Sequence, residues 1–277
     1  MQFMRRYQLT LVSDTDALII EDLRVNFSII KSIDSKPNPA SIKIWNLSQS
    51  NINRIVSNNI KSVILSAGYK ELVEIFKGDI IKSKVQRQNV DTVIDLTCAD
   101  GFKDYTQGRV KITLPAGATD KDIVNSLKDA FPSVTFGDLL TIPNMRKLPR
   151  GKVLNGNARE ILDDITKNNG ADWSIQDGEL VFLPKNTVLK NQIVALSQDS
   201  GLIGSPEKTD DGLEITCLLN SNLKVGGLVR VQSMFDFYNG FYKIIKISHD
   251  GDNLGGNWLS KITAVEGNFT TTGATLE

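Results

Sequence analysis

The sequence has little of the chemistry that metal sites need, because it contains one histidine and two cysteines in 277 residues. A zinc site needs about four clustered nitrogen or sulfur ligands. His249, Cys98 and Cys217 are too few and too far apart along the chain to supply them. We therefore expect no metal site and no cofactor.

The sequence also lacks an excess of charge, because lysine plus arginine and aspartate plus glutamate both number 32. Proteins that hold nucleic acid or anionic lipid across a wide surface carry a basic field. A local patch of Lys82, Lys84 and Arg87 is present, but charges that alternate along a strand are typical of a solvated face. We expect neither a general nucleic-acid surface nor a direct membrane anchor.

No run of about 20 apolar residues is present, so the sequence predicts no transmembrane helix. The first residues, MQFMRRYQLTLVSD, begin with the arginines of an export signal but continue as a short alternating strand. Cys98 and Cys217 each stand in a β-like run, where we expect small, buried, free thiols. These features predict a soluble protein that folds in a reducing cytoplasm without an export signal.

The patterns of phosphate-binding loops and of serine-nucleophile turns are missing, since GxxxxGK[S/T], GxGxxG and GxSxG do not occur. Asp163 and Asp164 could be proposed as the paired acids of a glycosidase. On the predicted helix they lie off the apolar face, which is typical of solvated residues. We predict that the chain is not an enzyme and has no catalytic residue.

The only histidine lies in KIIKISHDGDNLGGNW, residues 243–258, among acidic residues and glycines. A hydrolase could use His249 as a general base with Asp250 or Asp252 as its orienting group. The nucleophile is missing, because Ser248 is adjacent on a strand and points to the opposite face. A calcium loop is also incomplete, since Lys261 stands where the last glutamate belongs.

Turn chemistry explains the same segment better than a ligand site does. His249 is in phase with Ile245 and Ile247, Trp258 starts the next strand, and the residues between are Asp, Asn and Gly. We predict the last hairpin of a β domain. Its long polar loop could contact a neighbouring molecule.

The chain divides into three predicted domains and a tail. Residues 1–105 contain six short runs rich in Val, Ile, Thr and Phe, separated by turn residues, which predict a small antiparallel β-barrel. Residues 106–187 predict a mixed α and β domain, and residues 188–268 a second small β-barrel. Residues 269–277 predict a flexible tail. The expected fold is thus mainly β with an α+β middle domain.

Local signals place the helices and turns. Ser48 is the expected cap of a short helix on the first sheet. In the middle domain, Thr119 begins a capping box and a helix that ends before Pro132. A second helix is expected from Asn157 to Gly170, and Asp177-Gly178 is expected to turn a hairpin.

Four stretches in succession carry a family resemblance: NPASIKIWNLS, GNAREILDDITKNNGADWSIQDGELVFLP, GLIGSPEKTDDGLEITCLLNSNLKVGGLVRVQS and GFYKIIKISHDGDNLGGNWLSKITAV. Together they resemble the baseplate or tail hub proteins of long-tailed bacteriophages, above all contractile ones. The resemblance covers most of the chain. It implies two β-barrels of the tube type in each subunit and a ring of six similar barrels in a homotrimer.

The resemblance also implies a function and partners. The expected protein is a structural component of the virion that adapts a six-fold tail tube to a three-fold central spike. It is made in the host cytoplasm and also touches other baseplate proteins and the tape-measure protein, with DNA only as passing cargo. The alternatives are a tail-associated cell-wall hydrolase or a carbohydrate-binding tail-tip module. The middle domain is partly similar to peptidoglycan-binding LysM modules.

Overall fold

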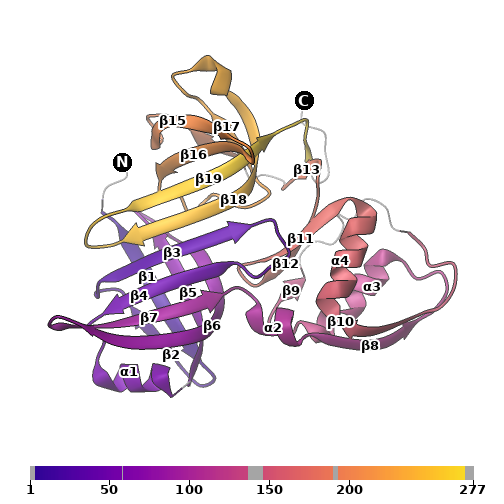
Figure 1. Cartoon of the computed structure of the whole chain (residues 1–277), viewed down its shortest axis with the longest axis horizontal. Helices are drawn as coiled ribbons and strands as arrows, with labels where there is room; N and C mark the ends of the chain where they lie inside the picture. Colours follow the sequence, from indigo (N-terminus) through magenta and orange to yellow (C-terminus); the bar gives the residue numbers. More distant parts are fainter. Residues whose placement is uncertain (1–3, 58, 137–145, 190–192, 272–277) are drawn as a thin grey trace.

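The computed structural model describes residues 4–57, 59–136, 146–189 and 193–271, and strands make up most of it. Figure 1 shows a first and a last β unit side by side, with a helix-containing middle unit next to them. The prediction of a mainly β fold with an α+β middle unit is confirmed.

The first unit consists of strands that alternate buried and half-exposed side chains. Val25, Phe27 and Ile29 are buried, while the residues between them are polar and half-exposed. Ser48 caps the helix by accepting a hydrogen bond from the backbone N–H of Asn51, as predicted. The elements are β1 (Arg6–Ser13), β2 (Ala17–Ile20), β3 (Val25–Ser32), β4 (Pro39–Trp45), α1 (Gln49–Val56), β5 (Ile60–Gly68), β6 (Leu72–Gln88) and β7 (Asp91–Ala99).

The middle unit holds most of the helix. Thr119 and Asp122 form the predicted capping box, but the α-helix ends at Ser126 and continues as a 3-10 turn, Lys128–Ala130. Gly170 ends the second predicted helix in a left-handed conformation (φ 58°). The elements are α2 (Phe102–Gln107), β8 (Arg109–Leu114), α3 (Asp120–Ser126), β9 (Thr135–Phe136), β10 (Lys152–Asn157), α4 (Ala158–Asn169), β11 (Ala171–Gln176), β12 (Glu179–Pro184) and β13 (Thr187–Val188).

The last unit is again made of strands: β14 (Ile193–Leu196), β15 (Leu202–Thr209), β16 (Gly212–Leu218), β17 (Leu228–Val231), β18 (Gly240–Asp252), β19 (Trp258–Glu266) and β20 (Thr270–Thr271). A 3-10 turn, Asp236–Tyr238, precedes β18. β20 pairs with β13, so the start of the predicted flexible tail is a strand in the structure. Residues 272–277 of that tail lie outside the described residues.

One 13-stranded sheet joins the two β units, in the order β15-β16-β19-β18-β3-β4-β7-β6-β5-β1-β2, with β17 beside β18 and β14 beside β17. The joint is the antiparallel pairing of β18 with β3, which Figure 1 shows in the middle of the sheet. The predicted barrels therefore share a sheet. Among the described strands, no pairing closes either unit on itself.

Three groups of buried apolar side chains follow the three units. The first core also contains Leu219 and Trp258 from the last unit, and Trp258 packs edge-on against Phe27 with ring centroids 5.3 Å apart. The first and last units therefore stabilise each other. The division into domains at residues 105, 187 and 268 stays a prediction.

Candidate functional site

One face of the 13-stranded sheet carries polar side chains across both β units. The residues that alternate with the buried ones along each strand point to this face and are mostly hydroxyl, amide and charged residues. The strand register places them in rows across the sheet, such as Ser41 beside Ser28 and Ser28 beside Asp250. We call this surface the polar face. Its residues are Asn26, Ser28, Ser41, Lys43, Lys82, Lys84, Asp95, Thr97, Glu214, Thr216, Lys246, Ser248, Asp250, Lys261 and Thr263.

Part of the charge on the polar face is neutralised within the face. Lys261 pairs with Glu214 at 2.7 Å, and Lys43 lies 3.9 Å from Asp95. The hydroxyl of Ser248 donates to Asp250 at 2.8 Å. The other lysines of the polar face, Lys82, Lys84 and Lys246, form no ion pair within the described residues.

The predicted hairpin loop that follows β18 is bound by the first unit of the same chain. Arg24 forms an ion pair with Asp252 at 2.8 Å, and the guanidinium of Arg5 donates to the Asp252 and Gly255 carbonyls. Asn253 accepts from the backbone N–H of Val25 at 2.8 Å. Most of the polar loop chemistry therefore joins the two β units within one molecule.

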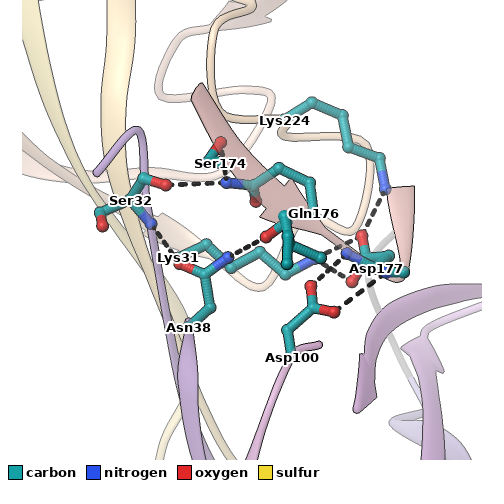
Figure 2. A network of polar contacts seen from close by, with 10 residues as sticks. Lys31, Ser32, Asn38, Asp100, Ser174, Gln176, Asp177 and Lys224 are labelled. Carbon is teal, nitrogen blue, oxygen red and sulfur yellow. Dashed lines mark hydrogen bonds and ion pairs between the residues drawn. The ribbon is translucent and has the colours of Figure 1, made fainter. Parts of the chain in front are cut away.

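A buried ion pair marks the place where all three units meet. Lys31 of β3 is 3 % exposed, and its ammonium group donates to both carboxylate oxygens of Asp177 at 2.6 Å. Asp177 lies at the tip of the β11–β12 hairpin of the middle unit, and its Oδ2 is 3.5 Å from the Nζ of Lys224 of the last unit. Figure 2 shows both lysines directed toward Asp177. Burial lowers the pKa of Lys31, against the attraction of Asp177. The two lysines hold the pKa of Asp177 below its usual value, although burial opposes this.

Asp100 fixes the backbone of the same hairpin tip. Its carboxylate accepts the N–H groups of Asp177 and Gly178, and it is 1 % exposed. Burial, and then repulsion by Asp177, raises the pKa of Asp100 to about 7. The hairpin turn was predicted from Asp177-Gly178, and both residues have positive φ, 55° and 80°.

Two amide side chains complete this contact, which we call the junction cluster: Lys31, Asn38, Asp100, Gln176, Asp177 and Lys224. Asn38 donates to the carbonyl of Ile175 at 2.8 Å, and Gln176 donates to the carbonyl of Ser32 at 2.7 Å. Figure 2 shows both amides between β3 and the hairpin. The cluster fixes the middle unit to both β units through one hairpin tip.

His249 is buried close enough to the junction cluster to interact electrostatically with Lys31 and Asp177. It is 1 % exposed, and its Nδ1 contacts the hydroxyl of Ser260 at 2.8 Å. Burial lowers the pKa of His249 to about 3, with repulsion by Lys31 adding to the effect. A bulge at Ile245 changes the predicted phase, so that Ile244, not Ile245, is buried on the side of His249.

The other residues considered from the sequence have structural surroundings. Asp163 accepts a hydrogen bond from the Trp173 indole at 2.6 Å, and Asp164 is exposed next to it on α4. Cys98 and Cys217 are buried free thiols, and burial raises the pKa of each to about 12. Within the described ranges, no cluster of three or more His, Cys, Asp or Glu residues could hold a metal ion. No helix in the described part of the chain is long and apolar enough to cross a membrane.

The sequence reasoning missed the junction cluster, although one signal pointed to it. Lys31 continues the buried phase of Val25, Phe27 and Ile29, and a lysine at a core position needs a buried carboxylate partner. The sequence could not show which acid from the middle unit supplies it.

Comparisons with known proteins agree with this architecture. A family model described as baseplate hub gp41 matches residues 7–260. No curated protein sequence matches the chain.

Solved structures with a similar fold come from several bacteria. The 43 kDa tail protein of prophage MuSo2 from Shewanella oneidensis has a TM-score of 0.66 at 10% identity, covering 94% of this chain and 98% of that one. A tail protein from Neisseria meningitidis MC58 has a TM-score of 0.61 at 12% identity, covering 95% and 97%.

A component of the Escherichia coli type VI secretion system, c3393, has a TM-score of 0.56 at 10% identity, covering 89% of this chain and 74% of that one. That protein is described as structurally similar to the T4 tail proteins gp27 and gp5. At these identities the similarity concerns the fold.

Proposed function

The chain belongs to the baseplate hub gp41 family, a family of structural proteins of bacteriophage tails, and on this basis we propose that three copies of it form the hub ring of a tail. The ring adapts a six-fold tail tube to a three-fold central spike. Tube protein binds one side of the ring and spike protein the other, with further baseplate proteins and the tape-measure protein as neighbours.

The single observation that supports this proposal best is the continuous sheet. Two β units in one chain, held edge to edge by β18 and β3, give three chains six units around an axis. The three proposed domains, residues 1–105, 106–187 and 188–268, are then two ring segments and one lateral unit. The polar face is the wall of the passage, past which DNA moves as cargo.

The residues on the polar face suit a passage. Hydroxyl groups and the Lys261–Glu214 pair give a polyanion little electrostatic hold. The unpaired lysines share the polar face with Asp95, Glu214 and Asp250, so the face does not form a wall of one charge. His249 is buried, and Asp163 accepts a hydrogen bond from the Trp173 indole. We propose a structural role because the family consists of baseplate hub proteins. We therefore expect no release of fragments when the full chain is incubated with purified peptidoglycan.

The proposal is tested by the oligomeric state and by partner binding. Light scattering and negative-stain microscopy of the full chain, alone and mixed with the tail tube and spike proteins of the same particle, should show rings of three copies. The proposal fails if the chain forms a stable dimer that binds neither partner.

A further inference from the structure

The two β units repeat one strand order. The first unit contains the path β3-β4-β7-β6-β5-β1, and the last unit contains β15-β16-β19-β18-β17-β14. In both paths a hairpin (β3–β4 or β15–β16) is followed by a crossover to the fifth strand of the path (β5 or β17) and a return through two hairpins. The outer strands differ, because β1 is antiparallel to β5 while β14 is parallel to β17. Apart from that difference, the six strands of one path correspond to the six strands of the other.

The strand registers make β6 the counterpart of β18 residue by residue. Both strands carry a bulge within the same tripeptide, Ile-Ile-Lys, at 80–82 in β6 and 244–246 in β18. Pairing with the preceding strand ends just before each bulge, at Asp79 and at Lys243. Lys84 therefore corresponds to Ser248, and Gln86 to Asp250.

After the bulge, β18 has a second partner that β6 lacks. Residues 246–252 pair with β3 on the side of β18 away from β19, which joins the two units. The corresponding part of β6, residues 82–88, pairs with β7, and among the described strands it has no partner on its other side. This half of β6 is a free strand edge.

The counterpart of β3 is also a free edge. By register, Ser28 corresponds to Glu207 of β15, and Ile30 corresponds to Thr209. β15 ends the path of the 13-stranded sheet and pairs only with β16 among the described strands. Within one chain, β18 and β3 are thus paired, whereas their counterparts, the second half of β6 and β15, are both unpaired on the corresponding edges.

The two free edges differ in charge: β6 carries a basic run, whereas β15 and its turn carry three exposed acidic residues and one exposed lysine, Lys208. Lys82, Lys84 and Arg87 are exposed on β6, and none of them forms an ion pair within the described part of the chain. Exposed acidic residues lie on β15 and its turn, namely Glu207, Asp210 and Asp211, and these are likewise unpaired within the described residues. Such complementarity favours this contact over β6–β6 or β15–β15 contacts.

We propose that residues 82–88 of β6 pair antiparallel with β15 of a second copy of this chain, as β18 pairs with β3 within the chain. This inference rests on the proposed hub ring and names its contact between subunits. Transfer of the β18–β3 register places Lys84 opposite Thr209 and Gln86 opposite Glu207. Such a contact is head-to-tail, and it gives a ring of three when its rotation closes after three copies.

The strand pairing of the proposed contact should be interrupted near Pro206. Pro206 has no N–H to donate, and the register of β15 shifts between Ile203 and Glu207. The backbone pairing therefore concentrates on residues 207–209, next to the acidic turn. Lys82 then lies near Asp210 and Asp211, where its charge is compensated.

Disulfide trapping tests the register directly. Lys84→Cys combined with Thr209→Cys in one chain should give covalently closed trimers on non-reducing gels, because directly opposite residues lie within disulfide reach. The matched control is Ser248→Cys with Ile30→Cys, the corresponding pair of the β18–β3 joint, which should cross-link at monomer mass. The buried native thiols Cys98 and Cys217 should not interfere.

Charge reversal tests the same contact without cysteine chemistry. Lys82→Glu with Lys84→Glu should abolish the trimer in light scattering, and Glu207→Lys with Asp210→Lys should do the same. Combining all four changes should restore it. Lys111→Glu with Lys167→Glu, on exposed positions of the middle unit, should leave the trimer intact.

The outcomes separate this inference from the proposed function. Suppose that the wild-type chain forms trimers and that both charge-reversal variants form them too, or that the Lys84→Cys/Thr209→Cys pair stays unlinked while the control pair cross-links. Either result overturns the β6–β15 contact and leaves the hub ring standing. Linked chains that form open polymers instead of closed trimers support the contact and overturn the ring of three.

Discussion

Replacing Asp177 by Asn should destabilise the protein far more than replacing an exposed partner of an ion pair. The change removes the negative charge that Lys31 contacts at 2.6 Å in a place where Lys31 is 3 % exposed. Removing one partner of a buried pair costs about 3–5 kcal/mol, because the other charge is left without compensation. Asparagine tolerates the positive φ of 55°, so little of the loss comes from the backbone.

The measurement is urea unfolding followed by circular dichroism, with a matched control. Asp14→Asn removes the partner of Lys61 in a pair whose side chains are 73% and 54% exposed, and it should cost less than about 1 kcal/mol. Lys31→Met combined with Asp177→Asn should recover part of the loss, because the buried ammonium group that lost its partner is then also removed. If Asp177→Asn costs no more than Asp14→Asn, the junction cluster does not hold the units together as described.

Three further predictions concern pH and packing. The pKa of Asp100 rises to about 7 on folding, so Asp100 contributes stability that is present below about pH 4 and lost as the pH rises through 7. Asp100→Asn should therefore flatten the fall in melting temperature between pH 5 and 8. An unchanged slope would contradict the assignment. His249 changes the stability in the opposite direction, since its pKa falls to about 3 on folding. Its contribution to stability is present above about pH 6.5 and is lost as the pH falls. His249→Gln should therefore reduce the loss of melting temperature between pH 6 and 4. Gly251→Ala places a Cβ 2.3 Å from the Phe27 ring and should cost about 1–3 kcal/mol in urea unfolding, whereas Gly255→Ala meets open space and should be nearly neutral; equal effects would contradict the packing.

Much of the local structure could be predicted because short-range signals determine it. The capping box of Thr119 and Asp122, the left-handed Gly170 and the Asp177-Gly178 turn were each predicted from adjacent residues and are present. Long-range features escaped, because nothing adjacent to Lys31 in the sequence names Asp177 as its partner. The bulge at Ile245 also escaped, since a one-residue slip in strand phase depends on the neighbouring strands.

The basic run of Lys82, Lys84 and Arg87 shows how position changes an interpretation. In the sequence it is typical of a solvated strand face, and in the structure it is indeed exposed. The equivalent half of the counterpart strand β18 is paired with β3, and this pairing is the basis for proposing a partner strand for the β6 edge. The interpretation of residues 243–258 changed in the opposite direction. Their loop was expected to be able to contact a neighbouring molecule, and in the structure it contacts Arg5 and Arg24 of the same chain.

The β18–β3 joint has a consequence for how the chain is made. Arg24 and Asp252, which meet at this joint, are 228 residues apart. Translation at about 5–20 residues per second means that the first unit waits roughly 10–45 s on the ribosome before β18 emerges. During that time the β3 edge, with Ile30 exposed, is an open template for pairing with other chains. Nascent chains on one messenger therefore risk joining edge to edge, and a ribosome-associated chaperone that covers β3 during this interval should raise the yield of correctly joined protein.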